Sequence, residues 1–304
     1  MSSPAASRGR GYAYALGAYS IWGLIPVYFK LLVAAPPLEV LAHRIVWAFV
    51  MLLPIAWHRD RLRELLRALR SSRARLQLSA STVLIALNWL IYIWAVFHGR
   101  IVEASLGYFL TPLVNVVLGV LVLKERLERP KLLAIALAAG GVLWLTLLSG
   151  RPPWISLGLA LSFGSYGLAR KVVRDVGAVA GLTVETGLLC APSLAYLAWA
   201  SASGTLAFRS GPPLRDVLLV LAGPVTAIPL LFFAGAVARL PLSSLGFLQY
   251  ASPSMQFLLA VLVYGEPFRA AQAGAFALIW LALAVFAAHT LRRGDAEPVM
   301  APDA

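Results

Sequence analysis

Long apolar blocks separated by short polar breaks form the main pattern of the chain. Each block has about 20 residues, the length that a helix needs to cross the hydrocarbon core of a bilayer. The predicted spans of the first half are 11–32, 39–57, 76–97, 101–122 and 130–148, and those of the second half are 154–171, 181–201, 215–236, 242–263 and 270–290. The pattern therefore predicts an all-α integral membrane protein with ten transmembrane helices.

The composition agrees with this class. Of the 304 residues, 60% are hydrophobic and 13% are charged, with a mean hydropathy of +0.81, whereas soluble domains are about half apolar and about a quarter charged. The polar start, Met1 to Arg10, leads directly into a full-length apolar block, so we expect no cleavable signal peptide. Cys190 is the only cysteine, which excludes a disulfide or a cysteine-based metal site within the chain.

Charge predicts the orientation. A formal net charge of +13 would suggest nucleic acid as the partner of a soluble protein, but here Lys and Arg gather in the breaks between apolar blocks. With ten spans both termini share one side, and most Lys and Arg fall there. The opposite side receives only Lys30, Arg100, Arg151, Arg209, Arg215 and Arg269. The positive-inside rule then places the N- and C-termini in the cytoplasm.

One break is itself patterned. Between positions 58 and 75, Leu62, Leu65, Leu66 and Leu69 recur at helical spacing among arginines. This is typical of a basic amphipathic helix on a membrane surface, with anionic lipid as its partner. A topology determinant and a regulatory or protein-docking element are the two interpretations.

The chain also repeats itself. A shift of 141 residues aligns five pairs, and a shift of 139 aligns a sixth motif. The pairs are Leu16-Gly17 with Leu157-Gly158, Gly23 with Gly164, Lys30 with Lys171, Pro112 with Pro253, Glu125 with Glu266, and Ser105-Leu106-Gly107 with Ser244-Leu245-Gly246. Matched Gly, Pro and Glu are harder to obtain by chance than matched Leu or Ala, so we interpret the two halves as related.

A repeat with an odd number of spans enters the membrane from the opposite side in its second copy. The predicted organisation is a first five-helix repeat over 1–149, an inverted second repeat over 150–291 and a cytoplasmic tail over 292–304. Inverted repeats are the architecture of secondary transporters that work by alternating access. A channel, or a duplication that only builds a stable bundle, is the alternative.

Several strings of the chain resemble a known family. These are Tyr19-Ser20-Ile21-Trp22-Gly23-Leu24-Ile25-Pro26-Val27-Tyr28-Phe29-Lys30, His43-Arg44-Ile45-Val46-Trp47, Asn88-Trp89-Leu90, Glu103-Ala104-Ser105-Leu106-Gly107-Tyr108-Phe109-Leu110-Thr111-Pro112-Leu113-Val114-Asn115, Leu245-Gly246-Phe247-Leu248-Gln249-Tyr250 and Tyr264-Gly265-Glu266. Together they resemble the RarD permeases of the EamA family, in the drug/metabolite transporter superfamily. The resemblance implies a ten-helix carrier in the bacterial inner membrane that exports metabolites or drugs, with amino acids and chloramphenicol-like compounds as candidate cargo.

Ionisable residues inside the predicted spans are the first candidates for function, because charge at membrane depth is costly. Arg44 lies within the second span beside His43, and Glu103 enters the fourth span from the same side. Arg44 either holds an anionic substrate group or forms a buried pair with Glu103. Glu185 lies 141 residues after Arg44, at the matching depth on the cytoplasmic side, where it either binds a substrate amine or a coupling proton or lies in interfacial water.

Aromatic and amide side chains complete the predicted cavity. The candidates are Tyr19, Trp22, Asn88, Trp89, Tyr92, Trp94, Tyr108, Asn115, Tyr166, Gln249, Tyr250 and Gln256, of which some Trp and Tyr are expected in interfacial belts. The amides of Asn88, Asn115, Gln249 and Gln256 should avoid lipid. Pro112 and Pro253 are the candidate hinges, although proline also forms passive kinks in static membrane helices.

The sequence gives little support for catalysis. No HExxH, GxSxG or Walker A motif occurs, and the four histidines are scattered. We therefore expect neither an enzyme nor a metal or cofactor site. A small-molecule substrate and the lipid bilayer are the expected partners, with a proton as candidate coupling ion and one chain sufficient for transport.

Overall fold

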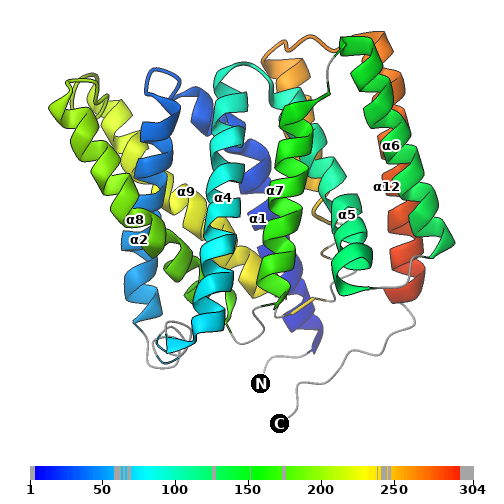
Figure 1. Ribbon diagram of the computed structural model, residues 1–304, viewed down its shortest axis with the longest axis horizontal. Helices are drawn as coiled ribbons and strands as arrows, with labels where there is room; N and C mark the ends of the chain where they lie inside the picture. Colours follow the sequence, from blue (N-terminus) through cyan, green and yellow to red (C-terminus); the bar gives the residue numbers. More distant parts are fainter. Residues whose placement is uncertain are drawn as a thin grey trace.

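The computed structural model describes residues 4–57, 63, 66, 70–124, 128–150, 152–172, 176–237, 239–240, 245 and 248–294. In these ranges the chain is helical and contains no strand. The helices are α1 (Pro4–Lys30), α2 (Pro37–Ala56), α4 (Ser72–Phe97), α5 (Ile101–Leu123), α6 (Arg129–Ser149), α7 (Trp154–Val172), α8 (Ala178–Ala202), α9 (Pro213–Val237), α11 (Ala251–Leu258) continuing into the π-helix η1 (Leu259–Val263), and α12 (Ala270–Gly294) (Figure 1). The predicted all-α class and the ten helices are confirmed.

Seven helices are long and apolar enough to cross a membrane by themselves. They are α2, α4, α5, α6, α8, α9 and α12. The first and sixth predicted spans are present as α1 and α7, which end in Lys30 and near Lys171 and carry more polar residues. The ninth, predicted over 242–263, is described as the shorter apolar helix 251–263. Part of the stretch before it lies outside the described residues.

The predicted surface helix over 58–75 can be followed only at its end. Ser72 to Arg75 form the first turn of α4, where the Ser71 hydroxyl accepts a hydrogen bond from the Ala74 amide and caps the helix. Most of the preceding stretch, with Leu62, Leu65 and Leu69, lies outside the described residues. The same is true of Glu125, Ser244 and Gly246 from the repeat.

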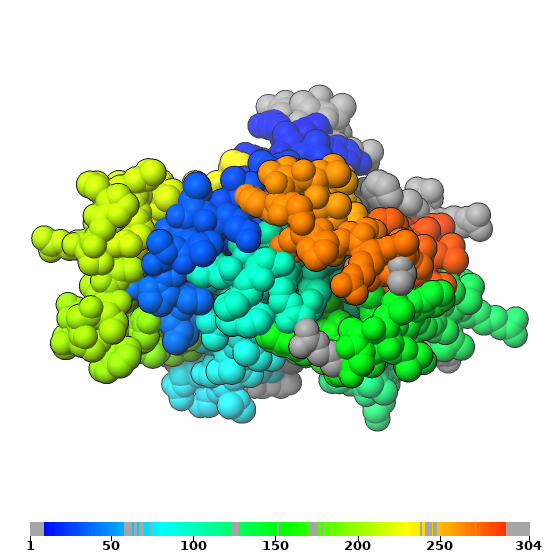
Figure 2. Space-filling model, turned by 90° about the horizontal axis from the view of Figure 1, so that it is seen from above, coloured from blue at the N-terminus to red at the C-terminus, as the bar shows by residue number. Residues whose placement is uncertain are grey.

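The helices cross the molecule in alternating directions, and α1 begins at the end where α12 finishes (Figure 1). We call this the terminal end and the other the opposite end. Helix α1 packs against α9 and α11, α7 packs against α4 and α5, α2 packs against α8 and α9, and α6 packs against α12. Figure 2 shows the opposite end, where the α1–α2, α4–α5 and α11–α12 connections pack together across the middle of the face.

Exchanging the two halves of the chain preserves this pattern of contacts. Helix α1 packs against α9 and α11, the third and fourth helices of the second half. Its counterpart α7 packs against α4 and α5, the third and fourth helices of the first half. The α2–α8 and α6–α12 contacts join helices with the same position in each half, and the α2–α9 contact has a smaller counterpart between α4 and α8.

Close helix contacts at matched glycines are related by the same shift of 141 residues. A Cβ atom at Gly23 would lie 2.8 Å from the Met255 side chain, and one at Gly164 would lie 2.8 Å from Val114. Residue numbers 23 and 164 differ by 141, as do 114 and 255. In a second set, a Cβ atom at Gly17 would lie 2.9 Å from Phe232, and one at Gly158 would lie 3.1 Å from Ile91. Residue numbers 91 and 232 also differ by 141. The matched glycines therefore allow equivalent helix crossings in the two halves.

Candidate functional site

A cavity of about 360 Å³ lies at the centre of the bundle, where α1, α2, α4, α5, α7, α8, α9 and α11 meet. Its aromatic walls are Tyr19, Trp22, Trp89, Tyr92, Tyr108, Phe163, Tyr166 and Phe233. Its polar and charged side chains are Arg44, Asn88, Thr111, Arg170, Thr226, Gln249, Ser252 and Gln256. Predominantly apolar walls with a few polar groups are typical of sites for small organic ligands.

Arg44 is the most unusual group in this wall. Its side chain is almost completely buried, and its guanidinium carbon lies 4.3 Å from the centre of the Trp89 ring and 5.7 Å from that of Phe29. Its Nε atom has no hydrogen-bond partner, and no carboxylate lies within ion-pair distance of it in the described part of the chain. A buried guanidinium that interacts only with aromatic faces retains donors for an anion.

The hypothetical pair between Arg44 and Glu103 is not formed. Glu103 instead accepts a hydrogen bond from the Nε atom of Arg100 at 2.7 Å. These two residues face each other because they are three positions apart where α5 begins. Glu103 and Arg100 line a second pocket of about 350 Å³ near Arg269, away from the central cavity.

His43 also lies away from the central cavity. Its Nδ1 atom accepts a hydrogen bond from Trp47 Nε1 at 3.1 Å, its ring centre lies 4.8 Å from that of Phe208, and its Nε2 atom is 3.9 Å from Glu39. Successive residues of a helix point about 100° apart. His43 therefore packs between α2 and the α8–α9 connection, while Arg44 faces the cavity.

Asn88 joins three helices at the cavity wall. Its Nδ2 atom donates to the Leu159 carbonyl oxygen at 3.2 Å and to Ser162 Oγ at 3.0 Å, and its Oδ1 atom accepts from the Tyr108 hydroxyl at 3.2 Å. The prediction that this amide avoids lipid is fulfilled, because the side chain is buried and connects α4, α5 and α7. It holds Tyr108 in position.

Gln256 of α11 has a free acceptor near the cavity. Its Nε2 atom donates to the Trp22 carbonyl oxygen at 2.9 Å, whereas its buried Oε1 atom has no partner. The Tyr92 hydroxyl, in the same wall, is also buried without a partner. Both atoms are available to a polar ligand.

Other predicted cavity residues lie elsewhere. Asn115 is exposed on α5, with its side-chain oxygen beside Gly164 and Gly167 of α7, and it does not line the central cavity; that its amide avoids lipid stays a prediction. Tyr250 stacks on Phe109 outside the cavity lining. Trp94 stacks on His98 with ring centres 3.9 Å apart. Pro253 lines the cavity, whereas Pro112 is buried in α5 and does not.

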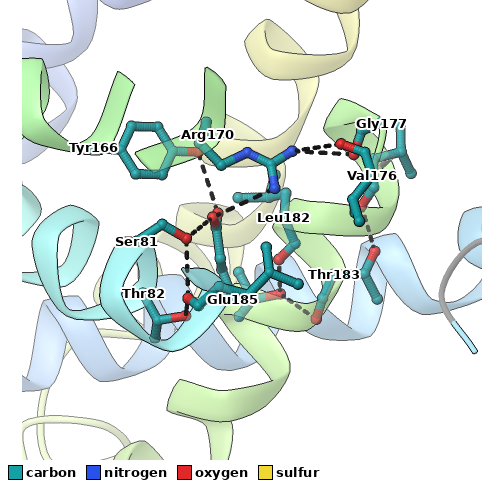
Figure 3. A network of polar contacts seen from close by, with 12 residues as sticks. Ser81, Thr82, Tyr166, Arg170, Val176, Gly177, Leu182, Thr183 and Glu185 are labelled. Atoms are coloured by element: carbon teal, nitrogen blue, oxygen red, sulfur yellow. Dashed lines mark hydrogen bonds and ion pairs between the residues drawn. The ribbon is translucent and has the colours of Figure 1, made fainter. Parts of the chain in front are cut away.

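Glu185 lies just behind the wall. It is completely buried, and its carboxylate accepts hydrogen bonds from Ser81 Oγ at 2.6 Å and from the Tyr166 hydroxyl at 3.2 Å (Figure 3). An ion pair of 3.8 Å joins it to Arg170. The interpretation that Glu185 lies in interfacial water is therefore wrong.

Arg170 was missed as a site residue because it lies at the end of the sixth predicted span, 154–171, and was counted with the charges of the polar break that follows. Its spacing from Tyr166 is the signal that could have identified it, since residues four apart share one helix face. Both side chains line the cavity.

Two buried carboxylates each join a helix start to a connection near the opposite end of the molecule. Glu39 of α2 accepts hydrogen bonds from the Ala207 and Phe208 amides at 2.8 and 2.7 Å. Glu266 accepts from Ile101 and Val102 at 2.8 Å each, at the start of α5. Amides at a helix start are free to bind an anion. The cavity lining instead extends toward the terminal end, where Arg170 and Val179 lie.

The chain is similar in sequence to membrane transporters. Residues 9–147 match the model of the EamA-like transporter family. An "Uncharacterized transporter" of Vibrio cholerae is 44% identical over 94% of this chain and 95% of its own length. "Protein RarD" of Escherichia coli is also 44% identical, over 93% and 97% of the two chains. The "Chloramphenicol-sensitive protein RarD" of Pseudomonas aeruginosa is 35% identical, over 90% and 92%.

A solved structure has the same overall fold. It superposes on this chain with a TM-score of 0.58 at 20% sequence identity, and it covers 95% of this chain and 99% of its own. This likeness supports the ten-helix arrangement along the whole chain.

Proposed function

This chain belongs to the EamA-like transporter family, in its RarD group, and we propose that it moves small amphipathic solutes with an anionic group across the bacterial inner membrane by alternating access. It is a membrane transporter by family membership. The central cavity is the proposed binding site, and export from the cytoplasm is the proposed direction.

The observation that carries this proposal is Arg44. A buried guanidinium without a carboxylate partner is costly to maintain unless an anion completes it. Arg binds carboxylates through a planar fork of donors. The surrounding Trp89, Tyr92 and Tyr108 offer apolar faces to the rest of the cargo. Amino acids carry such a carboxylate and are the candidate cargo. Chloramphenicol, which the name of one relative suggests, is uncharged and would bind through the aromatic walls alone.

Alternating access is supported by the shape of the cavity. The carboxylate contacts of Glu39 and Glu266 hold the starts of α2 and α5 to neighbouring connections at the opposite end, while the cavity lining extends toward the terminal end. We propose that 1–149 and 150–291 are inverted repeats that provide the second conformation, with 292–304 as a tail. The equivalent contacts of Gly23 and Gly164 support this division.

Helix bending has two proposed centres. Pro112 and Pro253 remove backbone hydrogen bonds within α5 and α11, and η1 follows directly after α11. Single-turn π-helical segments inside helices occur frequently at functional sites. We assign the hinge role to these two prolines.

Counterflow in proteoliposomes tests the proposed function. Vesicles loaded with unlabelled compound are diluted into labelled aromatic amino acids, aliphatic amino acids, aromatic carboxylates or chloramphenicol. Saturable accumulation of a subset of these compounds, lost in Arg44→Ala, is the expected result. Non-saturable flux without counterflow would indicate a channel, and no flux of any compound would contradict the proposed cargo class.

A further inference from the structure

Arg170 supplies the second guanidinium of the cavity wall, and only part of its hydrogen-bond donors have an acceptor. Its Nη2 atom donates to the carbonyl oxygens of Val176 and Gly177 at 3.3 and 3.1 Å. Its Nη1 atom is buried without a hydrogen-bond partner, 3.8 Å from the Glu185 carboxylate. Charge-assisted hydrogen bonds between such groups are usually about 2.7–2.9 Å long. One edge of the guanidinium is thus hydrogen-bonded, and the other has only the long ion pair to Glu185.

Glu185 has partners that remain if this ion pair is broken. The Ser81 hydroxyl and the Tyr166 hydroxyl both contact its carboxylate (Figure 3). Either hydroxyl can reorient to accept a hydrogen bond from a protonated carboxyl group. Glu185 is therefore placed to take up a proton without losing all of its hydrogen bonds.

Among the described residues, Arg170 is the one charged side chain that contacts Glu185. Helix α7 contributes Tyr166 and Arg170, and α4 contributes the Ser81 hydroxyl. The ionisable residues described in α2 and α9 lie in the first half of each helix, toward the opposite end of the molecule. They are Glu39, His43, Arg44, Arg215 and Asp216. The charge state of Glu185 is thus linked chiefly to Arg170.

The geometry also determines the sign of the charge that a ligand should carry. Arg170 and Tyr166 line the cavity, but Glu185 lies behind them. A molecule in the cavity therefore meets the Arg170 side chain before it can reach Glu185. Gly181 permits this arrangement, because a Cβ atom at that position would overlap with the Arg170 guanidinium.

We propose that Arg170 is an exchange site, separate from Arg44, that the cargo carboxylate occupies on its way through the cavity; there it replaces the Glu185 carboxylate, while Glu185 takes up one proton from water. The ion pair between Arg170 and Glu185 breaks, one O–H bond forms on Glu185, and a new ion pair forms between Arg170 and the cargo. Cargo anion and proton enter together, so the net charge of the site is unchanged. This inference rests on the proposed function and makes the transport a symport of proton and carboxylate.

Symport in this form is compatible with export. A cargo whose outward concentration gradient exceeds the inward gradient of protons drives both itself and the proton outward, because cargo and proton occupy the same loaded state. The exchange also prevents Arg170 from remaining unpaired in the empty carrier, because Glu185 neutralises it there.

Calorimetric binding of phenylacetate to the purified full-length protein tests the exchange. Phenylacetate combines an aromatic ring with a carboxylate, which is ionised at both about pH 6 and about pH 8. Wild type should bind it roughly tenfold more tightly at the lower pH, with net proton uptake measured from the dependence of the binding heat on the buffer. Glu185→Gln should bind tightly at both pH values without proton uptake, and Arg170→Gln should bind weakly at both.

Two conservative variants and one control complete the test. Glu185→Asp should retain the pH dependence, and Tyr166→Phe should shift it because one partner of the carboxyl group is lost. Glu103→Gln removes a carboxylate that pairs with Arg100 outside the cavity and should behave as wild type. If Glu185→Gln fails to fold, an unchanged pH dependence in Tyr166→Phe overturns the proposal.

The remaining outcomes are equally decisive. Unaltered pH dependence in Glu185→Gln, normal binding by Arg170→Gln, or no binding of phenylacetate by either wild type or Glu185→Gln would each contradict the exchange. Counterflow separates this failure from failure of the proposed function. A wild type that performs counterflow while Glu185→Gln binds like wild type refutes only the exchange, whereas tight binding without counterflow refutes only the transport.

Discussion

The guanidinium carbon of Arg44 lies 4.3 Å from the centre of the Trp89 ring, on the wall of a cavity at the middle of the bundle. The contact explains how a cation is tolerated there, because the aromatic face attracts positive charge. It does not use the hydrogen-bond donors of the side chain. The remaining donors define the chemistry that we expect of the cargo.

Arg44→Gln should reduce cargo affinity by more than tenfold in proteoliposome counterflow. Hydrogen bonds to charged groups contribute about 1.5–3 kcal/mol, and about 1.4 kcal/mol corresponds to tenfold. Arg44→Lys should also weaken binding, because an ammonium group lacks the planar fork. Arg239→Gln is the matched control, since Arg239 lies 5.2 Å from the Tyr14 ring but does not line the cavity. Equal loss in both variants would contradict a site at Arg44.

Asn88→Ala should destabilise the fold by about 1–3 kcal/mol, because it leaves buried partners on α5 and α7 without their hydrogen bonds. Thermal unfolding in detergent measures the effect. Asn115→Ala is the control on an exposed amide, and its effect should stay within about 0.5 kcal/mol. A larger loss from the change at Asn115 would refute the assignment of Asn88 as the structural joint.

Gly223→Ala should lower the unfolding temperature, because a Cβ atom there would overlap with the Trp47 backbone where α9 crosses α2. Overpacking of this kind costs about 1–3 kcal/mol. Gly140→Ala adds the same methyl group to α6 with no atom within 4 Å. That change should be neutral or slightly stabilising, since Ala favours helix more than Gly does. Equal effects would mean that α2 and α9 are not in close contact.

Glu266→Gln should open the opposite end more often, because an amide oxygen replaces a carboxylate that holds Ile101 and Val102. The measurement is modification of an Ile25→Cys variant, in a Cys190→Ala background, by an impermeant maleimide added on that side. We expect modification to accelerate on the order of tenfold, the equivalent of one charge-assisted hydrogen bond. Glu103→Gln is the control at the same end, and acceleration there as well would refute a specific contact.

The termini should lie in the cytoplasm, because the connections on their side carry most of the Lys and Arg residues. Alkaline phosphatase fused after residue 304 should therefore be inactive in cells. The same enzyme inserted beside Arg209, between α8 and α9, should be active. The reverse result would invert the proposed orientation and the side toward which the cavity extends.

The helices and their number follow from the sequence because a span of apolar residues is sufficient to place a helix in lipid. The matched glycines at a shift of 141 were also readable as a pattern, since close helix crossings need residues without side chains. Arg44 could be identified from its rarity at membrane depth alone.

The partners of those residues were not readable from the chain. Depth in the membrane predicted a pair between Glu103 and Arg44, yet Glu103 pairs with Arg100 because both lie at the start of the same helix. Arg170 and Glu185 face each other because α7 and α8 bring two distant turns together. Hydrophobicity fixes which segments enter the membrane, since it acts on each segment separately. Only the packing of helices against one another decides which side chains share a cavity and which polar atoms remain without a partner.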